Sequence, residues 1–276
     1  MNVGLAIRRN AVRAPESPAI FGDTQLNYQQ LDERSNQVAH WLSSKGLTKG
    51  DRVALFVANR HEVIEIMGGI AKCGLVYVGL NFRLGITELE QIFENAQPSL
   101  VITDEEHYVD INPIAEEFDL PLVVLDSDSW LTDVSKMPNH TPDTLHGVQH
   151  DDDFCIVYTS GTTGRPKGVL FDHSRATQHA TVACMEYQID SESRYLIQIP
   201  HNSSVNITIV PCLTVGASIG FRDSRNFDPV AFAREVEKEG VTHSFLVPTQ
   251  LMRVLDRLPR DADTKLFGLV TLGYGS

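Results

Sequence analysis

Residues 158–168 carry the clearest chemistry in this chain, and they read Tyr-Thr-Ser-Gly-Thr-Thr-Gly-Arg-Pro-Lys-Gly. Seven of the eleven are glycine or a small hydroxylated residue, and Lys167 adds a cation near the end. Glycines let the backbone turn tightly and approach a bound group closely. Backbone N–H groups, hydroxyl groups and an ammonium group can together bind a polyphosphate. The composition of this stretch therefore predicts a phosphate-binding loop.

The stretch is not a Walker A loop, which requires glycine directly before its lysine and serine or threonine directly after it. Here Pro166 precedes Lys167 and Gly168 follows it. The alternative is a plain Gly/Thr-rich surface loop. A simple linker would not need tyrosine, proline and lysine at fixed places, so the order favours a binding loop.

The loop needs a rigid support, and the surrounding sequence predicts one. A continuous apolar run at residues 154–157 is typical of a strand buried on both faces. Strand-like and helix-like segments alternate through most of the chain, which predicts an α/β fold with mostly parallel sheets flanked by helices. The other expected strands are residues 52–57, 75–78, 100–102, 122–125, 195–199, 217–221, 243–247 and 266–272.

Helix boundaries follow from capping signals. Asn27 with Gln30, and Asn59 with Glu62, fit the capping-box pattern, and Thr87 with Glu90 marks a third start. Further helices are expected at residues 174–188, from Asp228-Pro229 to Gly240, and from Pro248 onwards. Residues 127–153 are mostly polar and predict an exposed connection. We therefore expect one α/β subdomain over residues 1–150 and a second, carrying the loop, over residues 151–276.

Composition excludes several classes of function. The net charge of −13 over 276 residues disfavours binding to nucleic acid or to an anionic membrane surface. The sequence has no window of 18 consecutive apolar residues, so no transmembrane helix is predicted. The N-terminus lacks the continuous apolar core of a signal peptide, and we therefore expect a cytoplasmic protein. The four cysteines lie far apart and predict buried free thiols rather than a disulfide framework or a zinc site.

The order of residues 158–168 resembles the signature loop of the adenylate-forming superfamily, which includes acyl-CoA synthetases, amino-acid-activating domains and luciferases. Residues 26–31, 71–78 and 81–84 resemble segments that precede this loop in the family, with a matching order and spacing. Taken alone, these three segments predict structural roles in capping, packing and turning. The resemblance runs the length of the chain and is strongest to fatty-acid-CoA ligases.

The resemblance implies a reaction and its cofactors. A carboxylate attacks the α-phosphorus of ATP, pyrophosphate leaves, and the acyl-adenylate reacts with the thiol of coenzyme A. Mg²⁺ and positioned donors stabilise the charge that develops on oxygen. By this resemblance Thr163 would be a ligand of Mg²⁺, and Lys167 would act near the leaving pyrophosphate. The residues implied to bind the β- and γ-phosphates are Thr159, Ser160, Gly161, Thr162, Thr163 and Gly164.

Three further positions follow from the resemblance. His201, after an expected strand and Pro200, is implied to lie beside the acyl-adenylate, and the alternative is an exposed loop histidine. Gly273 and Gly275 begin a segment implied to pass along adenosine and the acyl group. Ser203 stands where amino-acid-activating members carry an aspartate. A serine cannot neutralise a buried ammonium group, so an α-amino acid substrate is disfavoured.

Family members are roughly twice as long as this chain. Expected elements that are absent include the Tyr-Gly-x-Thr-Glu segment, the ribose-binding aspartate, the hinge and the small C-terminal domain with its lysine. The resemblance thus implies an incomplete large N-terminal domain of an acyl-CoA synthetase, inactive by itself. Its partners would be a carboxylic acid, ATP, coenzyme A and the missing C-terminal half. The alternatives are a non-catalytic nucleotide-binding or interaction module, an aryl-CoA ligase, a luciferase-like oxygenase or an amino-acid-activating domain.

Overall fold

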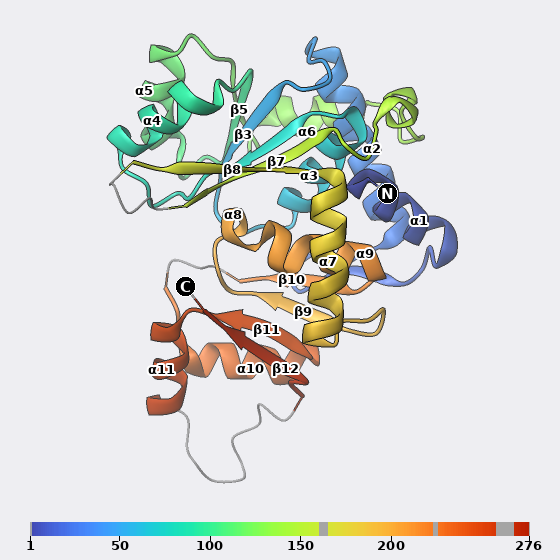
Figure 1. The fold of residues 1–276 in the computed structure, drawn as a ribbon, viewed down its shortest axis with the longest axis vertical. Coiled ribbons are helices and arrows are strands. Elements are labelled where there is room, and N and C mark those ends of the chain that lie inside the picture. The colour runs from blue at the N-terminus through green and yellow to red at the C-terminus, as the bar shows by residue number, and fades with distance from the viewer. Residues whose placement is uncertain (1, 160–164, 223–225, 258–267, 276) are drawn as a thin grey trace.

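The chain forms two six-stranded sheets with helices between them and on their outer faces (Figure 1). The computed structural model describes residues 2–159, 165–222, 226–257 and 268–275. The strands of the first sheet, in spatial order, are β6 (Leu122–Val124), β5 (Leu100–Thr103), β3 (Arg52–Phe56), β4 (Val76–Gly79), β7 (Asp153–Thr159) and β8 (Lys167–Asp172). Those of the second are β12 (Thr271–Tyr274), β11 (His243–Leu246), β9 (Arg194–Ile197), β10 (Ser218–Phe221), β1 (Pro18–Phe21) and β2 (Leu26–Asn27).

Neighbouring strands are parallel except for the pairs β7–β8 and β1–β2, each at the edge of its sheet. The described helices are α1 (Val3–Arg13), α2 (Tyr28–Ser44), α3 (Glu62–Cys73), α4 (Ile86–Ala96), α5 (Tyr108–Glu117), α6 (Asp128–Ser135), α7 (His173–Tyr187), α8 (His201–Ser204), α9 (Val210–Val215), α10 (Pro229–Glu239) and α11 (Pro248–Arg257), with a 3₁₀ turn η1 (Asp143–Gly147) and a π-helical turn η2 (Val205–Ile209). The expected α/β class with mostly parallel sheets is confirmed.

Side-chain alternation along the strands produces three hydrophobic cores. On β3, Val53 and Leu55 face the central core between the two sheets, while Ala54 and Phe56 face an outer core under α4 and α5. Successive residues of a strand point to opposite faces, so a run without polar residues is buried on both. The third core lies on the outer face of the second sheet, beneath α10 and α11, and includes Phe232. The result is a stack of helix, sheet, helix, sheet and helix layers (Figure 1).

The two sheets do not divide the chain at residue 150. Strands β1 and β2, near the N-terminus, belong to the second sheet, where Ile20 pairs with Ile219. Strands β7 and β8 belong to the first sheet, where Tyr77 pairs with Cys155. The edge of the second sheet is covered by the N-terminal hairpin, which satisfies backbone groups that would otherwise be exposed. The two halves of the sequence are therefore interleaved.

Local signals placed some boundaries incorrectly. Helix α4 begins at Ile86 after Gly85, and the Glu88 carboxylate accepts a hydrogen bond from Gly85 N, so the expected start at Thr87 is late. The polar connection at residues 127–153 contains α6 and η1. Helix α6 forms because Trp130 is buried edge-on against Trp41, with ring centroids 4.7 Å apart. The last described strand covers Thr271–Tyr274 rather than residues 266–272, of which residues 266 and 267 lie outside the described part.

Candidate functional site

The glycine-rich stretch connects the two strands of the β7–β8 hairpin. Thr159 ends β7 and lies directly opposite Lys167, the first residue of β8, and both are exposed. A Cβ atom on Gly168 would lie 2.9 Å from Ile156 Cγ2 and 3.1 Å from the Tyr158 ring, so this position requires glycine. The hairpin therefore holds the two ends of the expected phosphate loop together with their polar groups accessible. The loop residues themselves, Ser160, Gly161, Thr162, Thr163 and Gly164, lie outside the described residues, and so does the expected Mg²⁺ ligand among them.

His201, at the start of α8, is fully buried rather than exposed on a loop. Its Nε2 lies 3.1 Å from Val57 O, and its Nδ1 lies 2.6 Å from the Tyr77 hydroxyl. A carbonyl can only accept, so Nε2 carries the proton and Nδ1 accepts from tyrosine. Burial lowers the pKa of His201 to about 4, which keeps the ring neutral. With both nitrogens bonded within the protein, the ring links Tyr77 on β4 to the backbone of Val57 after β3.

Asn59 extends this link between the two sheets. Its Oδ1 accepts a hydrogen bond from His201 N at 2.8 Å, and its Nδ2 donates to Ile199 O at 2.9 Å and to Arg222 O at 3.1 Å. Asn59 therefore does not cap α3, which begins at Glu62 without a side-chain cap. The expected capping box there is wrong because the asparagine side chain is engaged by the other sheet. Through this residue, the loop after β3 is joined to the loops after β9 and β10.

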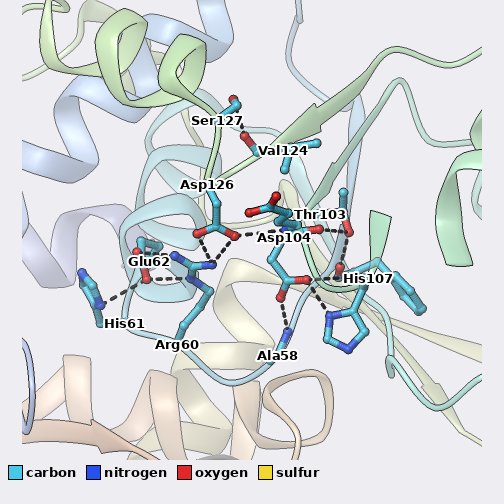
Figure 2. A network of polar contacts seen from close by, with 12 residues as sticks. Ala58, Arg60, His61, Glu62, Thr103, Asp104, His107, Val124, Asp126 and Ser127 are labelled. Carbon is cyan, nitrogen blue, oxygen red and sulfur yellow. Dashed lines mark hydrogen bonds and ion pairs between the residues drawn. The ribbon is translucent and has the colours of Figure 1, made fainter. Parts of the chain in front are cut away.

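A second polar network fixes the other side of that loop (Figure 2). Arg60 pairs with Glu62 at 2.8 Å and with Asp126 at 2.9 Å, and the hydrogen bonds that it donates to these carboxylates raise the pKa of the guanidinium. Ala58 N donates to Asp104 Oδ2 at 2.9 Å. These contacts hold together the segments that follow β3, β5 and β6. The sequence did not predict these contacts, because the residues that make them are single polar residues after strands and belong to no motif.

A cavity of about 440 Å³ lies at the carboxyl ends of β9, β11 and β12. In parallel sheets this is the edge where ligands bind. Its apolar lining comes from Ile199, Pro200, Ile207, Phe245 and Val247. Its polar lining comes from His179, Tyr187, Ser203 and Tyr274, and Gly275 completes it.

The cavity brings together some of the expected site residues and leaves others apart. Ser203 and Gly275 line it, whereas Gly273 lies just behind, where a Cβ atom would come within 2.8 Å of the Phe245 ring. His201 stands behind the wall, since its neighbour Pro200 lines the cavity and the buried imidazole does not. Lys167 and Thr159 lie on the hairpin and not in this cavity. Sequence analysis did not single out His179, whose helix carried no motif.

The buried histidines predict an acid-sensitive fold. Burial lowers the pKa of His173 and of His201 to about 4, against about 6.5 in an unfolded chain. Between these two pH values the unfolded state binds protons that the folded state does not bind. The contribution of the neutral histidines to the free energy of unfolding is therefore fully present above about pH 6.5 and is lost as pH falls towards 4. Each histidine can contribute a loss of about 3 kcal/mol. Urea unfolding across this range measures the slope.

Matched variants test the source of that slope. His173→Gln is expected to reduce the slope by about half, because His201 remains, whereas the same change at exposed His146 should leave the slope unaltered. A free energy of unfolding that stays constant over this range would contradict the assignment.

Comparison with known proteins identifies the class. The sequence profile of the family described as AMP-binding enzyme matches residues 7–275, and the chain belongs to this family. In the structural comparison, the inhibitor-bound N-terminal domain of FACL13 from Mycobacterium tuberculosis superimposes with a TM-score of 0.89 at 25% identity, over 100% of this chain and 70% of that one. ATP-bound MatB from Rhodopseudomonas palustris has the same fold, with a TM-score of 0.86 at 24% identity, over 100% of this chain and 55% of that one. The fold is that of the N-terminal domain of adenylate-forming enzymes.

Acyl-CoA ligases are among the sequence relatives. A feruloyl-CoA synthase from Amycolatopsis sp is 31% identical over 271 residues, which is 97% of this chain and 52% of that protein. A medium/long-chain-fatty-acid–CoA/3-oxocholest-4-en-26-oate–CoA ligase from Mycolicibacterium smegmatis is 35% identical over 165 residues, 56% of this chain and 30% of that protein. The chain thus spans about half the length of the first of these relatives. Within the described residues, no helix is both long and apolar enough to cross a membrane.

Proposed function

We propose that this chain is the ATP- and acid-binding N-terminal part of an ATP-dependent acyl-CoA synthetase. The enzyme would activate a carboxylic acid as its adenylate and transfer the acyl group to coenzyme A. The observation that carries the proposal is the cavity at the carboxyl ends of β9, β11 and β12, because it gathers Ser203 and Gly275 from distant parts of the sequence. The loop that joins β7 and β8 on the neighbouring sheet would meet the second requirement, a place for phosphates.

The phosphate-binding role belongs to the β7–β8 hairpin in this proposal. Thr159 and Lys167 are exposed and lie directly opposite each other, and the Lys167 ammonium group would be available to an anion there. The residues between them, Ser160, Gly161, Thr162, Thr163 and Gly164, would complete the cradle, with Thr163 towards Mg²⁺. When bound, Mg²⁺ neutralises charge on the phosphates and the leaving pyrophosphate. Lys167 would add positive charge on the same side.

The acid would occupy the cavity. Phe245, Val247 and Ile207 offer apolar surface that suits a fatty or aromatic acid. Among the described residues that line it there is no carboxylate, so an α-ammonium group would lack a counter-charge there. Gly273 and Gly275 place no side chains beside the Phe245 ring, which would favour close passage of a nucleotide or acyl group. His201 would act as a positioning residue that joins the two sheets.

The 276-residue chain by itself is expected to bind MgATP weakly, with a dissociation constant on the order of 1 mM, and to form no acyl-CoA. The physical reason is that the ATP-bound MatB structure contains nearly twice as much polypeptide as this chain. Equilibrium dialysis measures the binding, and a thiol-consumption assay with octanoate and coenzyme A measures turnover. Binding that is equally strong in Lys167→Ala would contradict the phosphate role. Acyl-CoA formation by the chain alone would contradict its dependence on a further segment.

A further inference from the structure

His179, on α7, lies where the cavity meets the π-helical turn η2. Its Nδ1 is 3.0 Å from the backbone carbonyl oxygen of Asn206, and its ring lines the cavity. The ring is exposed rather than packed into a core, because the cavity opens beside it. One nitrogen is therefore committed to the backbone while the other edge of the ring remains accessible.

The local sequence explains why the Asn206 carbonyl needs this partner. In η2, Val210 N donates to Val205 O, five residues earlier. The next carbonyl in this pattern belongs to Asn206, and the residue five positions later is Pro211, which has no N–H group. An unsatisfied buried carbonyl costs about 1–3 kcal/mol, so a side-chain donor is favoured at this point. His179 supplies it.

This hydrogen bond selects the tautomer of His179. A carbonyl oxygen only accepts, so Nδ1 carries the proton and Nε2 of the neutral ring is a pure acceptor. Among the residues that the structure describes, no hydrogen bond to Nε2 is recorded. The hydroxyl groups of Tyr187, Ser203 and Tyr274 can either donate or accept, so they do not discriminate between ligand groups. Among these polar side chains, only His179 has a backbone hydrogen bond that fixes its accessible nitrogen as an acceptor.

We propose that His179 is a specificity-determining residue that accepts a hydrogen bond from a hydroxyl group on the acid substrate. The inference rests on the proposed function, since it assumes that the cavity receives the acid. The surrounding lining from Ile207, Phe245 and Val247 offers no acceptor side chain, so a ligand hydroxyl held against these residues needs a polar neighbour to replace its water partners. An acceptor nitrogen in this lining restores one hydrogen bond and favours hydroxylated acids over their plain counterparts.

The test compares acids that differ only by a hydroxyl group, titrated into the 276-residue chain at about pH 8, where imidazole side chains are neutral. The probes are 4-hydroxycinnamate against cinnamate, and 8-hydroxyoctanoate against octanoate. At least one hydroxylated acid is expected to bind about tenfold more tightly than its partner. His179→Phe should remove this difference, and His179→Gln, which keeps an acceptor, should retain part of it. Nitrogen-15 spectra of the labelled imidazole should show a protonated Nδ1 and a shift of Nε2 only with the hydroxylated acid.

The outcomes separate the two proposals. If acids bind with no preference for the hydroxyl group, or if His179→Phe keeps the preference, the role of His179 is overturned and the acid site stands. If no acid binds to the wild-type chain, the cavity is not an acid site, and the proposed function fails together with the inference. A protonated Nε2 in the free protein would also overturn the inference.

Discussion

Replacing Lys167 with alanine is expected to lower acid-dependent ATP–pyrophosphate exchange at least about 100-fold in the full-length enzyme, meaning a protein that continues this chain with the half present in its relatives. The side chain is exposed at the start of β8, and within the described residues no ion pair to it is recorded. Its removal should therefore cost little stability. The lost charge would act on the phosphates, where one positioned donor contributes about 3 kcal/mol to the barrier.

The matched control for this variant is Lys238→Ala, which removes an exposed lysine from α10, far from the hairpin in sequence. It should leave the exchange rate unchanged. Thermal unfolding of both variants separates loss of activity from loss of structure. Unaltered exchange in Lys167→Ala would remove this residue from the proposed chemistry, and an equal loss in Lys238→Ala would point to a nonspecific effect of charge.

Replacing Lys72 with methionine is expected to destabilise the fold by about 3–5 kcal/mol, because it leaves a carboxylate without its buried partner. Lys72 Nζ is fully buried between α2 and α3 and lies 2.6 Å from Asp32 Oδ1, 2.7 Å from Ser35 Oγ and 2.7 Å from Asn36 Oδ1. Burial lowers the pKa of the ammonium group to about 8, so the charged form still predominates at neutral pH. Loss of this amount is a large share of the stability of a typical domain.

Two comparisons make this expectation specific. Lys45→Met removes a half-exposed lysine whose contact with Asp133 is 3.9 Å long, and it should cost less than about 1 kcal/mol. The double variant Lys72→Met with Asp32→Leu should recover part of the loss, because it removes the stranded carboxylate as well. Urea unfolding measures all three. A loss in Lys72→Met no greater than in Lys45→Met would show that the cluster is not stabilising.

Local signals predicted the elements whose determinants are themselves local. The capping box of Asn27 and Gln30 is present, Gly74 ends α3 in the left-handed conformation, and α10 begins at Pro229 and is ended by Gly240 as its signals indicate. The same kind of pattern predicted the wrong start for α3. The Asn59 side chain donates hydrogen bonds to the carbonyl oxygens of Ile199 and Arg222, in the loops after β9 and β10, and does not cap the helix. A pattern of four residues contains no information about such partners. The pairing of β1 with β10 was beyond reach for the same reason.

The site shows the same division. Composition alone led to the prediction of a phosphate loop, which stays a prediction because residues 160–164 lie outside the described part of the chain. The buried His201 ring is bonded to Tyr77 and Val57, which lie more than a hundred residues away in the sequence. No local feature of the sequence predicts these contacts. His179 was missed because its role follows from a carbonyl that Pro211 leaves without a donor. The proline and the helix were both predictable from the sequence, but the packing of this helix against η2 was not.

Acid-dependent ATP–pyrophosphate exchange by the full-length enzyme tests the central claim most directly, because it reports adenylate formation without requiring coenzyme A. Isotope from labelled pyrophosphate should enter ATP only when MgATP and a carboxylic acid are both present, with fatty or aromatic acids more effective than α-amino acids. Absence of exchange with every such acid, or exchange that proceeds without any acid, would contradict the account.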